Sequence, residues 1–229
     1  MARTVIIGDV HGCRDELAAL LDRVGFAKGD RLVMVGDLVV RGPDPAGTVD
    51  LLMSLDARAV RGNHEDRLLR IRAGEALANE PQRAVIAALS PRHWAFLEAL
   101  PLWLDLPEHD VRVVHAGVVP GVPIEQQPPR ALMYMRCLNR AGEPVEKRGD
   151  DLWGARYQGS PHMVFGHNAR TEPQLHPAAT GLDTGCVYGG RLTALVLDEG
   201  ARPPRSKGER RAWERSLVSV KAERRYAED

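Results

Sequence analysis

The chain has 229 residues, of which 44% are hydrophobic and 27% are charged, and its 31 basic residues balance its 31 acidic ones. A net charge of zero excludes the strong positive field of a nucleic-acid-binding protein, and this length supports one core with at most a small appendage. No segment approaches the ~20 apolar residues of a membrane span, and no signal peptide is visible. The three cysteines predict no disulfide framework. We therefore expect a soluble, cytoplasmic protein without stable nucleic-acid or membrane contacts, and the oligomeric state stays open.

The first third of the chain predicts strands that alternate with helices. Short β-branched or apolar runs predict strands, and leucines at helical spacing predict the helices between them. In chain order these are a strand over 4–7, a helix over 17–24, a strand over 31–35, a helix over 51–55 and a strand over 57–60. This rhythm is typical of a parallel sheet, whose functional groups gather beyond the carboxyl ends of the strands.

The remainder of the chain predicts a helical segment followed by further strands. Residues 66–100 are mostly helical, with Ser90-Pro91 as a helix start, and a Pro- and Gly-rich loop covers 120–150. The later strands are expected over 102–106, 111–115, 163–165, 180–183 and 191–198. We expect one domain over 1–200 and a charged tail over 201–229, helical or frayed, which carries Trp213, Leu217 and Val220.

Side chains that can bind metals stand at the ends of five predicted strands: Asp9, His11, Asp37, Asn63, His64, His115 and His167. Adjacent strands lie ~4.8 Å apart, so groups at neighbouring strand ends converge within ligand reach. Carboxylate, imidazole and amide ligands without a thiolate suit manganese, iron or zinc better than a soft metal. The set therefore predicts a metal centre at one end of the sheet.

Two divalent ions would lie ~3.5–4 Å apart at such a centre, with Asp37 as the natural bridge. Their charge would exceed that of Asp9 and Asp37, attract a phosphate group and lower the pKa of a bound water. The pattern predicts hydrolysis of a phosphoester or phosphoanhydride. The competing interpretation, in which histidines are structural, we keep for His93, His109, His162 and His176.

These motifs resemble the metallophosphoesterase superfamily, in its phosphoprotein-phosphatase-type branch. The resemblance spans residues 4–198 and is carried by Gly8-Asp9-Val10-His11-Gly12, Gly36-Asp37-Leu38-Val39-Val40-Arg41-Gly42, Gly62-Asn63-His64-Glu65, His115-Ala116-Gly117 and Gly166-His167. It implies an α/β fold of the calcineurin-like type, in which two mixed β-sheets form a sandwich flanked by helices. It also makes residues 1–200 a metallophosphoesterase catalytic domain.

The resemblance also implies a role for each motif residue. One metal ion would be held by Asp9, His11 and Asp37, and the other by Asp37, Asn63, His115 and His167. The ions would be manganese, with iron, cobalt or zinc as alternatives. His64 would be the general acid that protonates the leaving group. Arg41 and Arg156 would hold phosphate oxygens.

Within this branch the chain is most similar to symmetrical diadenosine tetraphosphate hydrolases. The likeness rests on residues 8–43 and 182–193, and Tyr188 in the second block could stack on a base of the substrate. Two features depart from that family: the chain is short between Gly117 and Gly166, and Glu65 replaces the usual aspartate. Glu65 is typical of protein phosphatases and of related hydrolase-like phosphatases.

Val40 bears on the choice of substrate, because protein phosphatases of this branch usually have there an aspartate that pairs with the catalytic histidine. Valine cannot accept a hydrogen bond from His64. A serine alkoxide needs a well-placed acid, whereas a nucleotide leaves as a phosphate-type anion whose relevant pKa is only about 6. Val40 thus favours phosphoanhydride cleavage, although packing at a strand end also explains a valine.

The sequence leads to three hypotheses. The first is a symmetrical bis(5'-nucleosyl)-tetraphosphate hydrolase that cuts diadenosine tetraphosphate into two molecules of ADP. The second is a phosphoprotein Ser/Thr phosphatase or a broad-specificity phosphatase of the same branch. The third, a non-catalytic scaffold, is disfavoured because His64 and all six candidate ligands are present.

Overall fold

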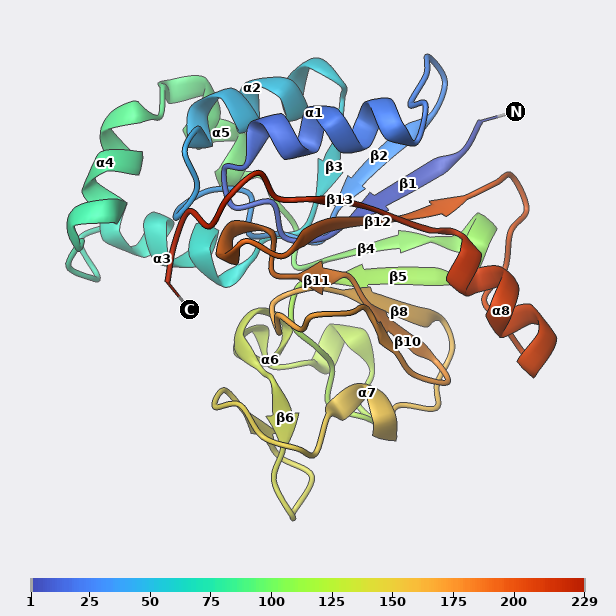
Figure 1. The fold of residues 1–229 in the computed structure, drawn as a ribbon. Coiled ribbons are helices and arrows are strands. Elements are labelled where there is room, and N and C mark those ends of the chain that lie inside the picture. The colour runs from blue at the N-terminus through green and yellow to red at the C-terminus, as the bar shows by residue number, and fades with distance from the viewer. Residues whose placement is uncertain (1, 229) are drawn as a thin grey trace.

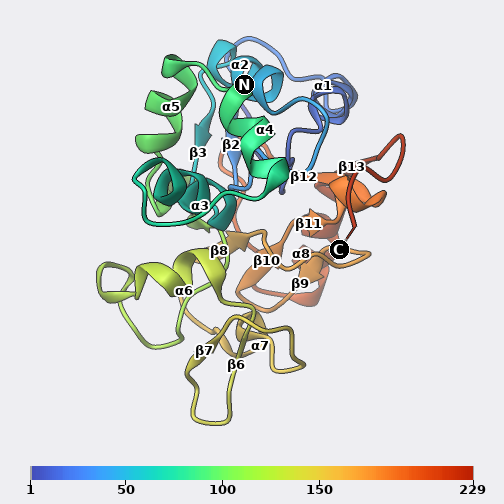
Figure 2. The ribbon, with the colours of Figure 1, turned by 90° about the vertical axis from the view of Figure 1, so that its left-hand side faces the viewer.

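The computed structural model describes residues 2–228, apart from the side chain of Lys207. Two β-sheets pack face to face, and helices cover both outer faces of this sandwich (Figures 1 and 2). The expected sandwich of two mixed sheets is confirmed. Among the described residues, no helix is both long and apolar enough to cross a membrane.

The first sheet combines parallel and antiparallel pairs. Strands β1, β2 and β3 are parallel, as the sequence predicts, whereas β12 runs antiparallel beside β1. The sheet order is β11-β12-β1-β2-β3, and β13 pairs with β12. The strands are β1 (Thr4–Ile7), β2 (Arg31–Met34), β3 (Arg58–Ala59), β11 (Asp183–Thr184), β12 (Arg191–Leu197) and β13 (Leu217–Lys221).

The second sheet has the order β4-β5-β8-β10-β9, in which β5, β8 and β10 are parallel. Its strands are β4 (Trp103–Leu106), β5 (Val111–Val114), β8 (His162–Phe165), β9 (Gln174–Leu175) and β10 (Ala179–Gly181). Successive side chains of a strand point to opposite faces. Val5 and Ile7 of β1 therefore pack against helices, whereas Ile6 packs against Val113 and Val164 of the second sheet.

Three of the helices, α1, α2 and α5, follow the predicted apolar spacing or capping signals. The first, α1, ends before Gly25, which has a positive φ of 60°, and α5 begins after Ser90 with Pro91 in its first turn. The helices of this part are α1 (Arg14–Arg23), α2 (Pro45–Ser54), α3 (Asn63–Arg72), α4 (Glu80–Ala88) and α5 (Pro91–Glu98). Three short 3-10 helices cover Pro107–His109, Ile124–Gln126 and Cys186–Tyr188.

The segment 120–150 contains more regular structure than the sequence predicts. It holds α6 (Pro129–Tyr134) and a two-stranded ribbon of β6 (Cys137–Leu138) and β7 (Pro144–Val145), and α7 (Trp153–Arg156) follows. Leu132 and Trp153 bury against the outer face of the second sheet. The segment is thus an excursion with short elements rather than a loop, and tertiary packing, rather than a local period, stabilises these elements.

The C-terminal tail is also more ordered than expected. A helix is present as α8 (Lys207–Arg215), but Leu217 and Val220 lie in β13 rather than in a helix. The Trp213 side chain is 5% exposed, packs between the two sheets and donates a hydrogen bond from Nε1 to Thr180 Oγ1 at 3.0 Å. The predicted helix is thus present, but the tail is not frayed, because Trp213 and the strand β13 complete the sandwich.

Candidate metal centre and active site

The predicted metal-binding side chains converge where strands of both sheets end. Asp9 follows β1 and Asp37 follows β2, whereas His115 and His167 follow β5 and β8 of the other sheet. The backbone N–H of His167 donates to Asp9 Oδ2 at 2.9 Å, which links the two sheets directly. Residues far apart in the sequence thus meet at one end of the sandwich.

Asp37 lies at the centre of this cluster. Its Oδ2 atom is 3.4 Å from His115 Nε2 and 3.6 Å from His11 Nε2, and its Oδ1 accepts the backbone N–H of His64 at 3.0 Å. Ligand atoms of His11, Asp37 and His64 lie within 4.8 Å of one another, as do those of Asp37, His115 and His167. Asp37 is therefore shared by two groups of potential metal ligands.

The histidine rings of the cluster are oriented by backbone carbonyls. His115 Nδ1 is 2.9 Å from Val35 O, and His167 Nε2 is 3.0 Å from Tyr134 O. The other nitrogens, His115 Nε2 and His167 Nδ1, lie 3.0 and 2.9 Å from Asn63 Oδ1. Each ring therefore donates to a carbonyl on one side and turns its other nitrogen toward an oxygen that only accepts.

This arrangement fits bound cations. An imidazole that donates through one nitrogen can face an oxygen acceptor with the other only if a cation, either a proton or a metal ion, lies between them. Burial lowers the pKa of His11 and His167 and keeps these two rings neutral, whereas burial of His115 is outweighed by the charge of Asp37 and by hydrogen bonds, so that its pKa is raised. Asp9 Oδ1 is also buried and has no hydrogen-bond partner among the described residues. An unpartnered buried carboxylate oxygen is costly. The donor set of carboxylate, imidazole and amide thus fits divalent metal ions.

The carboxylates of the site repel one another. Burial raises the pKa of Asp9 well above its ordinary value, and the negative charges of Asp183 and Asp37 raise it further. Burial likewise raises the pKa of Asp183 to about 6. Burial opposes ionisation of Asp37 too, but the charges of His115 and His64 outweigh it and lower its pKa. The site is therefore short of positive charge.

Glu65 fixes the loop that carries Asp37. Its side chain is fully buried, and its carboxylate accepts the backbone N–H groups of Asp37, Leu38 and Gly62, each at 2.9 Å. Burial raises the pKa of Glu65 to about 7, and the charge of Asp37 adds to this. The sequence marked Glu65 only as a departure from one family, and this positioning role was missed.

Left-handed backbone is concentrated at this site. A positive φ is rare for residues other than glycine, costs about 1–3 kcal/mol and is typical of functional loops. Val40 and Arg41 adopt it in succession, with φ of 72° and 75°, although valine is β-branched. The other three at the site are His11, Asp37 and His167. The turn after β2 is thus held in one strained conformation that presents Arg41.

Arg41 contacts Tyr188, which places two predicted substrate residues side by side. The Arg41 guanidinium donates to the Tyr188 hydroxyl, and its Cζ lies 5.3 Å from the ring centroid. Burial lowers the pKa of His11 to about 3, and the nearby charges of His64 and Arg41 contribute to this shift. Arg41 therefore lies beside the cluster, as expected.

Arg156 lies in a different environment from the one predicted. Its Nε donates to Asp151 Oδ1 at 2.8 Å, and its side chain is about half exposed. Arg136, which the sequence analysis did not select, acts on the cluster through its positive charge. Burial lowers the pKa of His64 and of His167, and the charge of Arg136 contributes in both. Only the fold brings Arg136 here, since no motif surrounds it.

A nitrogen of the His64 ring lies within 4.8 Å of a ligand atom of His11 and of one of Asp37. The His64 ring meets the His11 ring edge-on, with the ring centroids 4.9 Å apart. Within residues 2–228 no carboxylate accepts a hydrogen bond from the His64 ring, and Val40 is buried. The geometry therefore agrees with the expectation that Val40 leaves this histidine without an orienting acid.

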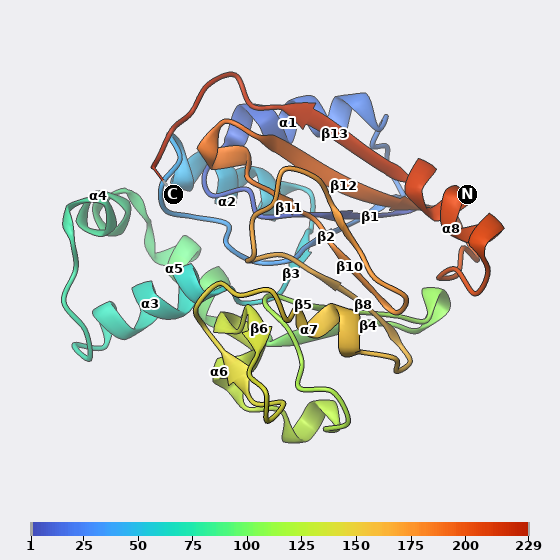
Figure 3. The same ribbon diagram turned by 60° about the horizontal axis from the view of Figure 1, so that its bottom comes forward.

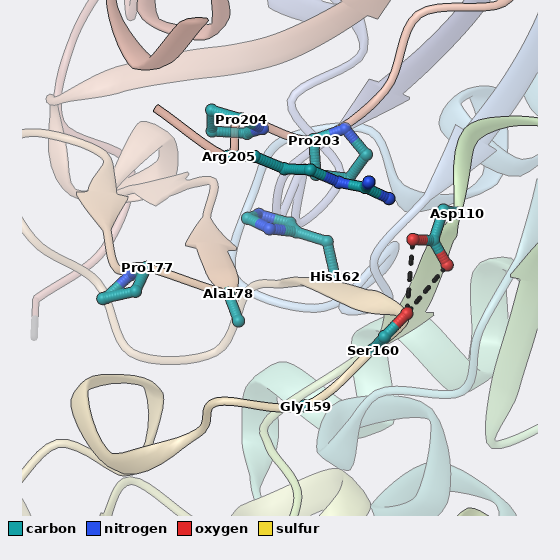
Figure 4. A pocket seen from close by; sticks show the side chains of 9 residues that line it. All are labelled: Asp110, Gly159, Ser160, His162, Pro177, Ala178, Pro203, Pro204 and Arg205. Atoms are coloured by element: carbon teal, nitrogen blue, oxygen red, sulfur yellow. Dashed lines mark hydrogen bonds between the residues drawn. The ribbon is translucent and has the colours of Figure 1, made fainter. Parts of the chain in front are cut away.

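The histidines that we assigned to structural roles lie away from the cluster. Figure 4 shows His162 beside a cavity of about 160 Å³ that Asp110 and Arg205 also line. His109 bonds through both nitrogens, to Ala201 O and Thr4 Oγ1, and His93 contacts Asp50 at 2.6 Å. Neither these three rings nor the fourth one, that of His176, belongs to either group of potential metal ligands in the described part of the chain.

The comparison with known families agrees with this geometry. The calcineurin-like phosphoesterase family matches residues 2–200. The chain belongs to this family. Its membership and the two ligand groups around Asp37 support a metal-dependent phosphoesterase, as the resemblance of the motifs implied.

Relatives and solved structures refine the comparison. The chain is 32% identical to "Bis(5'-nucleosyl)-tetraphosphatase PrpE [asymmetrical]" of Halalkalibacterium halodurans, which covers 85% of this chain and 89% of the relative. The Geobacillus thermodenitrificans protein of the same name is 30% identical, with 85% and 90% covered. A crystal structure described as "a putative diadenosine tetraphosphatase" is 35% identical, with a TM-score of 0.82, and covers 96% of this chain and 94% of that one.

The names of these relatives differ from our expectation in the position of the cut. The sequence analysis favoured a symmetrical cut, whereas the names of these calcineurin-like relatives specify an asymmetrical one. A more distant protein serine/threonine phosphatase from Saccharomyces cerevisiae, 16% identical with a TM-score of 0.57, shares the fold alone. Dinucleoside tetraphosphates therefore stand out as the substrate class to test.

Proposed function

We propose that the chain is a two-metal hydrolase of dinucleoside tetraphosphates. One observation carries this proposal: ring nitrogens of His11, His115 and His167 turn toward oxygens that only accept, around a shared Asp37. Such a cluster attracts cations and, through them, a phosphate group. The names of the relatives supply the substrate class.

Two divalent ions would be held at the six residues that the motifs predicted. Asp9, His11 and Asp37 would hold one ion, and Asp37, Asn63, His115 and His167 the other. When bound, such ions lower the pKa of coordinated water and neutralise charge on the phosphate. Manganese as the metal and a cytoplasmic location stay predictions, as does the division of the chain at residue 200.

We further propose that the cut is asymmetrical, so that diadenosine tetraphosphate gives ATP and AMP. This replaces the symmetrical cut favoured by the sequence, because the relatives named asymmetrical align with 85% of the chain. The sequence likeness to symmetrical hydrolases rests on residues 8–43, which include the proposed ligands Asp9, His11 and Asp37, and on residues 182–193, which include Tyr188 but no proposed ligand. A centre that acts on one phosphoryl group does not by itself select the position of the cut.

The other side chains around the proposed metal centre donate protons or bind phosphate oxygens. His64 donates a proton to the departing nucleotide, and Arg41 neutralises phosphate oxygens while Tyr188 holds its guanidinium. Arg136 adds positive charge on the side of His167. Arg156 could join them only if its bond to Asp151 opened. A departing nucleotide is a weak base, which suits a His64 ring without an orienting carboxylate.

A second cavity beside Tyr188 suits the nucleoside end of the substrate. It has a volume of about 420 Å³ and is lined by Arg148, Arg170, Thr171 and the turn around Gly185. The aromatic ring offers a surface for a base, and the arginines offer donors for phosphate or ribose oxygens. The predicted stacking role of Tyr188 is part of this proposal.

Product analysis tests the proposal directly. The manganese-loaded protein should convert diadenosine tetraphosphate to equal amounts of ATP and AMP at early times, separated by ion-exchange chromatography. ADP as the sole product would refute the asymmetrical cut and restore the symmetrical one. Faster turnover of a phosphoserine peptide than of the dinucleotide would instead favour a protein phosphatase.

A chain that binds both ions but turns over no phosphorylated compound would support the scaffold hypothesis. A panel of dinucleotide, phosphopeptide, p-nitrophenyl phosphate and a phosphodiester, each with a manganese titration, separates these outcomes. Repeating the panel with iron, cobalt and zinc shows which metal supports the highest activity.

A further inference from the structure

The last residues of the chain are fixed in place beside the active site. The Tyr226 N–H donates to Val187 O at 2.9 Å, in the turn that carries Tyr188. The Tyr226 hydroxyl and the Glu223 N–H both donate to Glu16 Oε1 of α1, at 2.7 and 3.1 Å. This C-terminal segment, residues 222–228, lies beyond residues 2–200, which the family match covers.

The C-terminal segment and the turn after β2 enclose a positively charged cavity. It has a volume of about 330 Å³, and Arg41, Arg224 and Arg225 supply its charged walls. The Arg225 Nη2 atom lies 2.7 Å from Glu228 Oε2, but the Glu228 side chain is 84% exposed, and such an ion pair holds weakly. Arg225 thus has one exposed carboxylate beside it, and the Arg224 guanidinium lies over the Tyr226 ring with its Cζ 5.3 Å from the ring centroid.

Arg41 connects this cavity to the metal centre. The residue that follows Arg41 is Gly42, whose N–H donates to His11 O at 2.8 Å. Arg41 is therefore adjacent in the chain to a residue that contacts a candidate metal ligand. Its guanidinium has five donors, and the bond to Tyr188 uses one of them. An anion in the cavity and a phosphate at the metals could therefore both contact Arg41.

We propose that Arg224 and Arg225, together with Arg41, bind the phosphate groups of the substrate that extend beyond the group at the metal centre. The proposal rests on the proposed function, since only a polyphosphate chain has such further groups. A tetraphosphate carries several negative charges in a row, and the metal ions neutralise those at one end. Guanidinium groups suit the remaining phosphates because their planar donors bind phosphate in pairs.

The C-terminal segment is therefore a specificity element added to the family domain. It would favour substrates with several linked phosphates over compounds with one. A monophosphate such as p-nitrophenyl phosphate reaches the metals without entering the cavity. The contribution of Arg224 and Arg225 should therefore appear in polyphosphate binding and not in monophosphate binding.

The test compares two arginine pairs of the same tail. The double variant Arg224→Ala/Arg225→Ala removes the cavity charges, and Arg210→Ala/Arg211→Ala removes an equal charge from α8, at the opposite end of the molecule (Figures 1 and 3). Calorimetry of the manganese-loaded proteins with an analogue of diadenosine tetraphosphate in which methylene groups replace all three oxygens that bridge the phosphorus atoms measures binding without turnover, because neither the asymmetrical nor the symmetrical cut can occur. We expect Kd to rise about tenfold or more in the first variant and less than about twofold in the second.

Two outcomes would overturn the inference: equal affinity of Arg224→Ala/Arg225→Ala and the wild type, or an equal loss in both double variants. The KM for p-nitrophenyl phosphate should stay within about twofold in all three proteins, and a parallel rise would likewise contradict it. A wild type that binds the analogue through these arginines but does not cleave the dinucleotide would refute the proposed function alone. Circular dichroism of each variant checks that the exposed substitutions leave the fold intact.

Discussion

The two ends of the β-sandwich carry similar side chains in contrasting surroundings. At the amino ends of the strands, His109 Nε2 faces Thr4 Oγ1 at 3.0 Å and His162 Nε2 faces Thr180 Oγ1 at 2.9 Å. A hydroxyl can donate, so a neutral ring is satisfied there. At the carboxyl ends, the inward nitrogens of His115 and His167 face carboxylate and amide oxygens that cannot donate.

The contrast suggests a criterion that separates a structural histidine from a proposed metal ligand. Burial does not separate them, because His109 and His115 are 1% and 0% exposed. The deciding feature is the partner of the second ring nitrogen. Strand β8 is flanked by a histidine of each kind. It begins with His162, whose Nε2 faces a hydroxyl, and His167 follows its end. The predictions below test this difference, from the largest expected effect to the smallest.

Removing the charge of Asp37 should have the largest effect. Asp37→Asn leaves the shape of the side chain but removes the anion shared by the two ligand groups, so both metal binding and activity should fall together. We expect a loss of activity beyond the ~10²–10⁴-fold that one proton donor supplies. Mass spectrometry of metal content and initial rates measure this. Retention of two ions per chain would refute the shared role of Asp37.

His64→Ala should separate proton donation from metal binding. We expect activity to fall by ~10²–10⁴-fold on a phosphoserine peptide and by less on the dinucleotide, whose leaving group is the weaker base. The variant should bind as many metal ions per chain as the wild type, because the six proposed ligands remain. Equal losses on both substrates would contradict the interpretation of Val40, and undiminished turnover would refute the role of His64.

Glu65→Gln should act through the loop that carries Asp37. The amide keeps one acceptor oxygen of the two that bind four backbone N–H groups, so the loop should loosen. Loss of such a supporting contact costs ~10–100-fold in metal affinity or activity. A manganese titration should show weaker binding with activity restored at high manganese. Loss of activity that manganese does not restore would exclude this positioning role.

His162→Gln should leave activity within about twofold, because the ring lies at the opposite end of β8. Burial lowers the pKa of His162 from 6.5 to about 4. Below pH 6.5 the unfolded chain binds a proton that the folded chain excludes, so folding stability falls as the pH drops toward 4. This costs about 3 kcal/mol in all. Urea unfolding from pH 7 to 4 should show a shallower decline in the variant, whereas parallel curves would contradict the shift.

The sequence predicts the strand ends of the metal centre well because local rules act there. An apolar strand segment followed by Gly-Asp or Gly-His puts Asp9, Asp37 and His167 just beyond the carboxyl ends of their strands. This placement depends on the local sequence and not on the rest of the fold. The structure brings these residues together as expected. Their roles as ligands stay a prediction that metal analysis must test.

The sequence could not predict features that depend on long-range packing. Arg136 and Glu65 act through neighbours that only the finished fold supplies, and the docking of Trp213 depends on a strand that joins the sheet after the helix. The position of the cut lies beyond the motifs as well, because they describe the metal centre and not the cavities around Tyr188. Comparison with relatives changed that expectation.

Anomalous scattering from a crystal grown with manganese tests the central claim most directly. The account predicts two manganese peaks about 3.5–4 Å apart, with Asp37 between them. The other five ligands should be Asp9, His11, Asn63, His115 and His167. An absence of peaks at this end of the sandwich, or ions held by other side chains, would contradict it.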